Sequence, residues 1–406
     1  MKRLLATITI LALIATSLAA CGGGGATSTT SAITTAATEA ATEAPTEAQT
    51  VATTTTTAPP PSSTTMEIVQ APETEAPILI GVAMPTRTVE RWIYEGDLME
   101  EQLRAAGYDV ILQFANDDVA TQINQIENMV SNGAKFLIIC PIDGSSLSVP
   151  LRTAKAQGVQ ILSYDRLIMD TTDVDYFVGF NSERIGNHMG NSLMAGIGAA
   201  NATPENPLYI EMFAGSLDDS NTTYYFHGAV DMIQPYLDSG AVVVKSGQTT
   251  MEQCATPGWD AGLAQNRMEN LLSAYYTDDL LAGALSPYDG LSLGMIAALR
   301  AVGYGTEDRP MPAITGQDCE LPSLISIWNN EQYSSIFLDF DLLVSTATGV
   351  ATAMLSNLPI EKTMDYNNNV IDVASYLADA FELTKANIPY YFFERGTLTE
   401  ADLQLQ

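Results

Sequence analysis

Ile78-Leu79-Ile80-Gly81-Val82-Ala83 is the stretch of sequence that decides the fold class. A strand that is buried on both faces of a parallel sheet is apolar along its whole length, not at alternate positions. Residues 91–106 follow with apolar side chains at helical spacing, and Gly107 ends this predicted helix. A buried strand followed by an amphipathic helix is the repeating unit of an α/β fold.

The same alternation continues to about residue 315. Further strands are expected at 109–114, 136–140, 159–164, 207–213, 242–245, 283–286 and 313–315. Further helices are expected at 120–132, 148–157, 224–237, 263–276 and 291–302. We therefore expect two similar doubly wound α/β lobes with parallel sheets. Ligands of such sheets bind beyond the carboxyl ends of the strands, so two facing lobes would hold the ligand in the cleft between them.

Polar and aromatic side chains follow several of these strands. The candidate binding residues are Arg91, Asp165, Arg166, Asp219, Asn221, Trp259, Tyr288 and Asp318. Neighbours at the same strand ends are Arg87, Glu90, Trp92, Asp218, Asp289 and Gln317. Charged and amide groups bind sugar hydroxyls as donors and acceptors, and an aromatic ring packs on the apolar face of a pyranose. The set indicates a monosaccharide site.

Each candidate alone has another explanation. Asp165 and Arg166 would also fit a surface or interlobe ion pair. Trp259 would fit a core position, and Asp318 a turn or a helix cap. Only their shared position at strand ends favours the binding site.

An enzyme is the main alternative to a binding protein. Asp218, Asp219 and Asp318 would supply the paired carboxylates of a glycosidase. Against this, the sequence has no nucleophile motif, and His188 and His227 lack the spacing of metal ligands. We expect no catalysis, no metal and no cofactor.

The N-terminus indicates the compartment. Lys2 and Arg3 precede an apolar stretch, Leu4–Leu18, that is too short to span a bilayer. Leu18-Ala19-Ala20-Cys21 looks like a bacterial lipobox, which predicts a signal peptide at 1–20 and lipidation of Cys21. The protein would contact the membrane through this lipid anchor only.

Residues 21–76 are rich in Thr, Ala and Glu and have almost no large apolar side chains. Such a segment cannot offset its ordering entropy by burial, so it predicts a disordered tether. A tether of this length favours a Gram-positive-type surface, on the outer face of the cytoplasmic membrane.

The overall charge limits the ligands. The chain has 17 Lys and Arg against 48 Asp and Glu, a formal net charge of −31. Such a surface repels phosphate backbones, which excludes nucleic acid and is easiest to reconcile with a neutral ligand. Of the other cysteines, Cys140 lies in an apolar run, and pairing of Cys254 with Cys319 stays open.

Motifs in order from Ile78 to the C-terminus resemble the multiple-sugar-binding proteins of sugar ABC transporters, with the xylose-binding proteins as close relatives. These motifs are Met84-Pro85-Thr86, Glu90-Arg91-Trp92, Asn124–Met129, Tyr164–Ile168, Gly215-Ser216, Asn270–Tyr276, Ser286–Gly290 and Gly316-Gln317-Asp318. The resemblance covers nearly all of the folded part.

The resemblance implies a type I periplasmic binding protein with a three-segment hinge. Its N-terminal lobe would comprise 77–182 with 338–371, and its C-terminal lobe 183–337 with 372–406. The first lobe would bind ring and hydroxyl oxygens through Arg91, Asp165 and Arg166. The second would stack Trp259 on the sugar and add Asn221, Tyr288 and Asp318, with Asp219 as an orienting carboxylate.

The implied function is that of a monomeric receptor that closes on a pentose or hexose. It would deliver this sugar to an ABC permease and its ATPase. A receptor of the same fold that signals through a membrane sensor is the alternative.

Two positions depart from the family pattern. A lysine usually follows the run that is Tyr333–Phe337 here, where it reaches the sugar, and this chain has Leu338. Ser220 stands where asparagine is common. The loss of a charged donor implies a different epimer or a less polar ligand.

Overall fold

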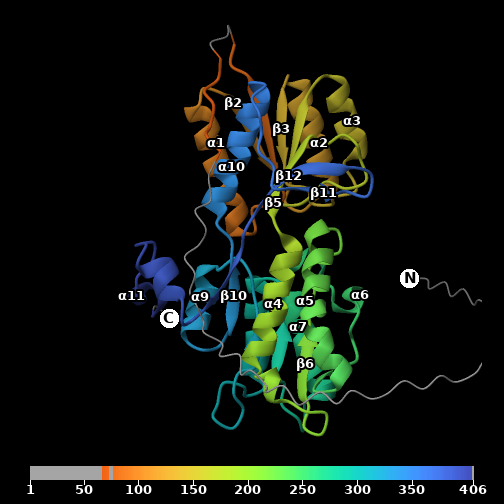
Figure 1. The fold of residues 1–406 in the computed structure, drawn as a ribbon, viewed down its shortest axis with the longest axis vertical. Helices are drawn as coiled ribbons and strands as arrows, with labels where there is room; N and C mark the ends of the chain where they lie inside the picture. The colour runs from red at the N-terminus through yellow and green to blue at the C-terminus, as the bar shows by residue number, and fades with distance from the viewer. Residues whose placement is uncertain (1–65, 73–75, 405–406) are drawn as a thin grey trace, which may run out of the picture. The chain divides into compact units, whose positions relative to one another are not determined.

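The computed structural model describes residues 66–72 and 76–404, which form two α/β lobes (Figure 1). The first lobe is built on a seven-stranded sheet of order β11-β12-β5-β4-β3-β1-β2. Its strands are β1 (Leu79–Met84), β2 (Asp109–Phe114), β3 (Phe136–Ile139), β4 (Gln160–Tyr164), β5 (Tyr176–Phe180), β11 (Met364–Asn367) and β12 (Asp372–Ala378). All pair in parallel except β11, which is antiparallel to β12.

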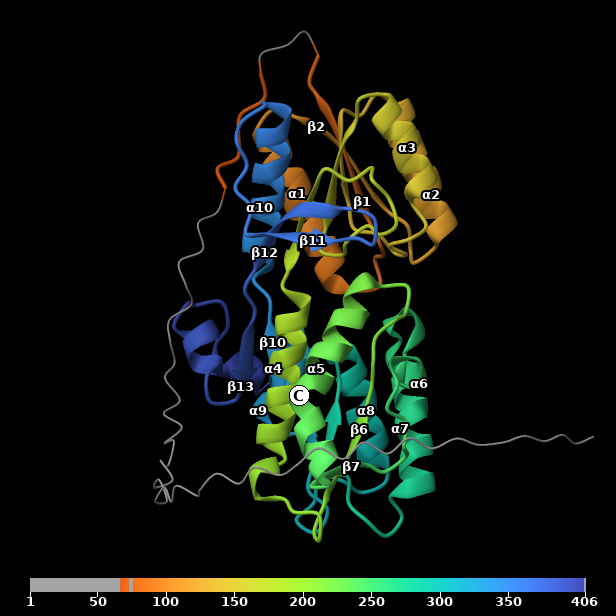
Figure 2. The same ribbon diagram turned by 45° about the vertical axis from the view of Figure 1, so that its right-hand side comes forward.

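Helices cover both faces of this sheet. One face carries α1 (Glu90–Ala105) and α10 (Phe340–Leu355), and the other carries α2 (Val119–Ser131) and α3 (Ser148–Ala156) (Figure 2). Strand β1 serves both layers, because Ile80 and Val82 pack into one hydrophobic cluster and Ala83 into another. Its apolar sequence is therefore explained by burial on two sides, as expected.

The second lobe has a four-stranded parallel sheet of order β7-β6-β8-β9. Its strands are β6 (Leu208–Met212), β7 (Val242–Val244), β8 (Gly283–Leu285) and β9 (Ala313–Ile314). A two-stranded antiparallel sheet of β10 (Ser334–Phe337) and β13 (Phe381–Thr384) continues it through a bridge from Gln317 to Ile336. The two-lobed α/β fold with parallel sheets is the expected fold class.

Helices α4 (Ser182–Gly196) and α5 (Ser220–Ser239) lie side by side on one face of this lobe (Figures 1 and 2). Its other helices are α6 (Met251–Cys254), α7 (Ala261–Tyr275), α8 (Asp289–Ala301), α9 (Leu321–Trp328) and α11 (Glu400–Leu403). Short turns of helix are η1 (Ala199–Asn201), η2 (Pro257–Trp259) and η3 (Pro389–Phe393).

The chain passes between the lobes three times. It leaves the first sheet after β5, returns after β10 into α10, and leaves again after β12 into β13. The expectation that 372–378 belong to the C-terminal lobe is wrong. Residues 372–378 form β12, which pairs with β5 and places Ser375 opposite Phe177 in the first sheet. The third crossing therefore lies at residues 379–380.

The predicted signal peptide, Cys21 and most of the predicted tether lie outside the described residues. Residues 66–72 are described, and for them the expectation of a free tether is wrong. Met66, Ile68 and Ala71 pack against the core of the first lobe. The Val69 amide donates to Thr352 Oγ1 at 3.1 Å, and the Ala71 amide donates to the Ala106 carbonyl at 2.8 Å. We call residues 66–72 the N-terminal strap.

The structure settles whether Cys254 and Cys319 form a disulfide. Cys140, Cys254 and Cys319 are buried free thiols. Cys254 and Cys319 belong to different hydrophobic clusters, so they do not pair. Within residues 66–72 and 76–404, no helix has the length and apolar content needed to cross a bilayer.

The strap should contribute to stability. Deleting residues 66–72 removes three partly buried apolar side chains and two hydrogen bonds, so the free energy of unfolding should fall by about 2 kcal/mol. Urea unfolding followed by circular dichroism measures this. A chain that lacks only residues 22–61 is the control and should match the full chain. Equal stability with and without the strap would contradict its packing role.

Candidate functional site

A cavity lies between the carboxyl ends of the strands of the two lobes, with about 520 Å³ of space, open solvent at its mouth included. All eight candidate binding residues line it. The lining also contains Thr86, Val89, Trp92, Asp117, Tyr225, Gly258 and Gln317. Residues that were selected because they follow strands therefore line one cavity, although some of them are more than 200 positions apart in the sequence.

Arg91 lies at the centre of the polar network. It is 8% exposed, and its guanidinium group pairs with Asp165 at 2.8 Å and with Asp318 at 3.3 Å. Asp165 belongs to the first lobe and Asp318 to the second, so one side chain joins both. The rings of Trp92 and Phe340 lie 4.0 and 4.1 Å from the Arg91 Cζ and hold the guanidinium group from the sides.

Glu95 fixes Arg91 from behind and was not expected from the sequence. It follows Arg91 by one helical turn on α1, is fully buried, and pairs with Arg91 Nε at 2.6 Å. The Tyr164 hydroxyl donates to the other Glu95 oxygen at 2.5 Å. An acidic residue four positions after an arginine is common on any helix surface, so sequence spacing alone does not reveal this buried role.

Burial and charge act against each other in this network. Burial by itself lowers the pKa of Arg91, but the carboxylates of Asp165, Glu95 and Asp318 outweigh it and raise that pKa well above its ordinary value. Burial raises the pKa of Glu95 to about 7, although Arg91 opposes the shift. Burial also raises the pKa of Asp318. Arg91 is therefore a permanent cation in the wall of the cavity.

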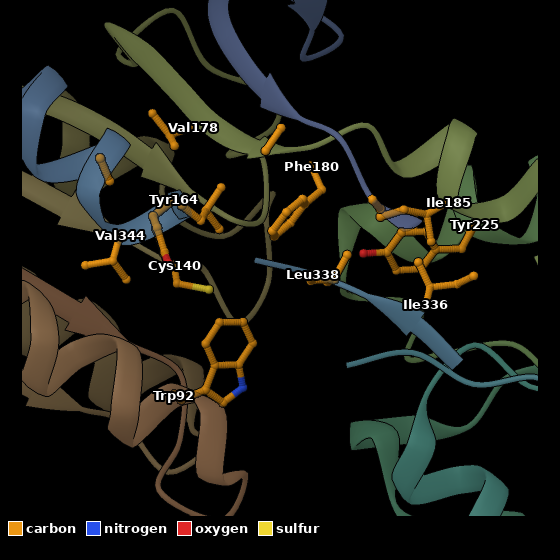
Figure 3. Packing of buried hydrophobic residues seen from close by; sticks show 14 of the residues in the cluster. Trp92, Cys140, Tyr164, Val178, Phe180, Ile185, Tyr225, Ile336, Leu338 and Val344 are labelled. Carbon is orange, nitrogen blue, oxygen red and sulfur yellow. The ribbon is translucent and has the colours of Figure 1, made fainter. Parts of the chain in front are cut away.

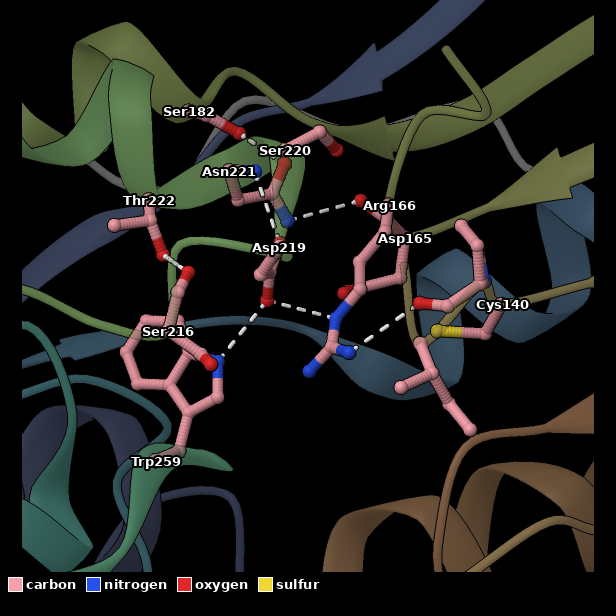
Figure 4. A network of polar contacts seen from close by, with 12 residues as sticks. Cys140, Asp165, Arg166, Ser182, Ser216, Asp219, Ser220, Asn221, Thr222 and Trp259 are labelled. Atoms are coloured by element: carbon pink, nitrogen blue, oxygen red, sulfur yellow. Dashed lines mark hydrogen bonds and ion pairs between the residues drawn. The ribbon is translucent and has the colours of Figure 1, made fainter. Parts of the chain in front are cut away.

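A second ion pair connects the lobes beside the first. Arg166 Nε lies 2.8 Å from Asp219 Oδ2 (Figure 4). The same carboxylate oxygen accepts a hydrogen bond from Trp259 Nε1 at 3.2 Å, and the other oxygen accepts one from the Asn221 amide at 2.9 Å. Asp219 thus sets the positions of both Arg166 and Trp259. Burial raises its pKa, with Arg166 acting in the opposite direction.

The remaining candidates, Asn221 and Tyr288, are each fixed by a side-chain hydrogen bond. Asn221 Nδ2 donates to the Asp165 carbonyl at 3.2 Å, which is a further contact between lobes. Tyr288 meets the Trp259 ring edge to face, with ring centroids 6.1 Å apart, and its hydroxyl donates to Glu320 at 2.8 Å. The aromatic wall of the cavity is thus fixed on its polar side as well.

Four residues of the cavity lining have a left-handed backbone conformation. Asp117, Asp165, Trp259 and Asp318 have φ values of +61°, +59°, +55° and +92°, in the left-handed region that disfavours side chains. Such conformations persist where the surroundings impose them, typically at binding or catalytic sites. Four strained residues in one cavity lining support its functional role independently of charge.

The two departures from the family pattern lie outside the cavity lining. Leu338 is 1% exposed and belongs to the apolar cluster near the lobe crossing, where Phe180 and Ile336 lie close by (Figure 3). Ser220 Oγ accepts a hydrogen bond from the Leu167 amide at 3.1 Å and so links the lobes.

Not every polar residue that follows a strand lines the cavity. Asp289 is fully buried behind it, and its carboxylate accepts hydrogen bonds from Gln332 and Ser335. Conversely, Thr86 and Asp117 line the cavity and were missed, although each follows a strand of the first sheet. Tyr225 was also missed, because it lies one helical turn beyond Asn221 on α5 and does not directly follow a strand.

The raised pKa of Glu95 predicts a pH dependence of stability. Its ordinary value is 4.5 and its folded value is about 7, so the folded state binds more protons between these limits. The free energy of unfolding should therefore fall as the pH rises from 5 to 7.5, by on the order of 2–3 kcal/mol from this group. Urea titrations across this range should show a flatter profile for Glu95→Gln.

Glu101→Gln is the matched control, because Glu101 is an exposed residue of the same helix. Its profile should follow that of the unaltered protein. Identical slopes for all three proteins would contradict the assignment of this pH dependence to Glu95.

Known proteins match this chain in sequence over most of its length. A family model for the periplasmic binding protein domain matches residues 80–358. The multiple sugar-binding periplasmic receptor ChvE of Rhizobium radiobacter is 44% identical over 319 residues, which cover 78% of this chain and 90% of the receptor. The multiple sugar-binding periplasmic protein SbpA of Azospirillum brasilense is 39% identical. This match covers 80% of this chain and 91% of SbpA. Both names describe binding proteins, not glycosidases.

A solved structure extends the likeness to three dimensions. The solute binding protein of an ABC transporter from Clostridium phytofermentans, solved with bound β-D-glucose, superposes with a TM-score of 0.75. The two sequences are 37% identical, and the superposition covers 80% of this chain and 99% of the Clostridium phytofermentans chain. The family match and these relatives show that the chain belongs to the periplasmic binding protein family, alongside the multiple sugar-binding receptors.

Proposed function

We propose that this chain is the sugar-binding receptor of an ABC importer and takes a monosaccharide, a pentose or a hexose, into the cavity between its lobes. One observation carries the proposal: Arg91 lies between Asp165 of the first lobe and Asp318 of the second. A ligand that binds to this trio contacts both lobes at once. The bound glucose in the Clostridium phytofermentans protein and the names of the two relatives support a sugar as that ligand.

The lining suits a polyhydroxylated ring. In the proposed complex, Arg91 and Arg166 donate to ring and hydroxyl oxygens, and Asp165 and Asp318 accept from hydroxyl groups. The Trp259 ring packs on the apolar face of the sugar. Two further side chains of the second lobe, Asn221 and Tyr288, complete the ligand set. Asp219 acts indirectly, since it orients Arg166 and Trp259.

Delivery to a permease and its ATPase follows from the receptor role in an ABC importer. A sensory receptor that passes the signal to a membrane partner remains the second candidate, because it would use the same cavity. Neighbouring genes for a permease and an ATPase would favour transport.

We place the protein on the outer face of the cytoplasmic membrane, held by lipid on Cys21. The lipobox-like Leu18-Ala19-Ala20-Cys21 supports this. Radiolabelled fatty acid should be incorporated by cells that produce the full chain and not by cells that produce Cys21→Ser. Equal labelling of both would contradict the anchor.

Asp318→Asn tests the proposed contact set. Asparagine keeps the shape but removes the charge that pairs with Arg91, so affinity for the preferred monosaccharide should fall about 10- to 100-fold. Isothermal calorimetry, after a screen of common pentoses and hexoses, measures this. Asp308→Asn is the control, as an exposed carboxylate of the same lobe. If no monosaccharide binds the unaltered protein, the proposed function is wrong.

Closure of the lobes predicts a change of size. Three crossing segments allow the lobes to rotate, and a ligand that contacts both favours the closed arrangement. Small-angle X-ray scattering should show a smaller radius of gyration at saturating sugar than without sugar. An unchanged radius with a tightly bound ligand would contradict hinge closure.

A further inference from the structure

A second cavity lies on the second lobe and shares no lining residue with the cavity between the lobes. Its walls come from α7, from α6 and from the loop before α6, and it has about 920 Å³ of space, open solvent at its mouth included. Four lining residues have side-chain amides, and none of the lining residues is acidic, in a chain with 48 Asp and Glu. We call this the α7 cavity.

Arg267 lines the α7 cavity without a counter-charge. Its Nη1 donates to the Met212 carbonyl at 2.8 Å and its Nη2 to Gln248 Oε1 at 2.9 Å, and both acceptors are neutral. Among residues 66–72 and 76–404, no carboxylate lies within ion-pair distance of Arg267, and its buried Nε has no hydrogen-bond partner. Arg91 and Arg166, in contrast, are each paired with a carboxylate.

The groups around Arg267 do not neutralise it. The Cys254 thiol lies 3.9 Å from Nη2 and is uncharged at neutral pH, because burial raises its pKa to about 11. Glu211 acts on Arg267 only from a greater distance, and its oxygens accept hydrogen bonds from the hydroxyl groups of Ser246 and Tyr276. Burial lowers the pKa of Arg267, and Cys254 and Glu211 only partly oppose this shift. A half-buried cation in this state favours an anion from outside.

The two glutamines of the α7 cavity present donors. Gln248 uses its Oε1 for Arg267, which has only donors to offer. Gln253 uses its Oε1 for the backbone amides of Thr249 and Thr250, at 3.1 and 3.2 Å. In the described part of the chain, neither Nε2 group has an acceptor. Two amide donors beside a cation complement a ligand with negatively charged acceptor oxygens.

We infer that the α7 cavity is a second binding site and takes a small oxyanion, a carboxylate or phosphate group. Arg267 supplies the charge, and the Nε2 groups of Gln248 and Gln253 supply further donors to the anion's oxygens. The site is separate from the proposed sugar site, so anion binding does not require a sugar.

Inorganic phosphate and acetate are the probes. Each is added at about 10 mM to the protein, with sodium chloride of equal ionic strength as the reference, and thermal unfolding is followed by circular dichroism. We expect at least one probe to raise Tm by about 2–4 °C over the reference, because a ligand that binds only the folded state stabilises it. A rise with phosphate alone identifies a phosphate group as the ligand, and a rise with acetate alone a carboxylate. No rise with either would overturn the inference.

Gln248→Glu locates the effect. Glutamate keeps an oxygen for Arg267, removes the Nε2 donor and supplies the missing counter-charge. The variant should lose the anion-dependent rise in Tm and, without anion, should melt no lower than the unaltered protein, because a charge-assisted bond replaces a bond to a neutral amide. Gln157→Glu makes the same charge change at an exposed position of the first lobe and should keep the full rise. An equal rise in all three proteins, or a lower Tm of anion-free Gln248→Glu, would overturn the inference.

Discussion

The ion pairs of Arg91 are the interaction on which the rest of the site depends. A buried guanidinium group is expensive to desolvate, and three carboxylates from α1 and from both lobes compensate for that cost. Because two of them, Asp165 and Asp318, come from different lobes, the same charges that stabilise Arg91 also connect the lobes. In the proposed function, the same set of atoms connects the lobes and binds the sugar.

The sheets explain how these atoms meet. Parallel strands end at a common edge, and the residues that follow them point toward the facing lobe. The strain at Asp165, Trp259 and Asp318 indicates that the surrounding packing imposes these positions, at a cost in conformational energy. Asp219 completes the arrangement by fixing Arg166 and Trp259 with a single carboxylate.

Much of this could be predicted from the sequence, because continuous apolar strands and the residues after them are local signals. The eight candidate residues line one cavity for that reason. What could not be predicted depends on tertiary pairing. The strand β12 alternates polar and apolar residues near the sheet edge and was assigned to the wrong lobe. The strap has a tether-like composition, and only its contacts with Thr352 and Ala106 show that it packs on the fold. Glu95 and Tyr225 lie one helical turn after Arg91 and Asn221 on α1 and α5, too far along these helices to be recognised as residues that follow a strand.

The central claim is that a sugar binds between the lobes on the Arg91 trio. The most direct test is a crystal structure of the protein with its tightest-binding monosaccharide. The account predicts the sugar within hydrogen-bond distance of Arg91, Asp165 and Asp318, with one face against Trp259. A sugar bound elsewhere, or contacting residues of one lobe only, would contradict it.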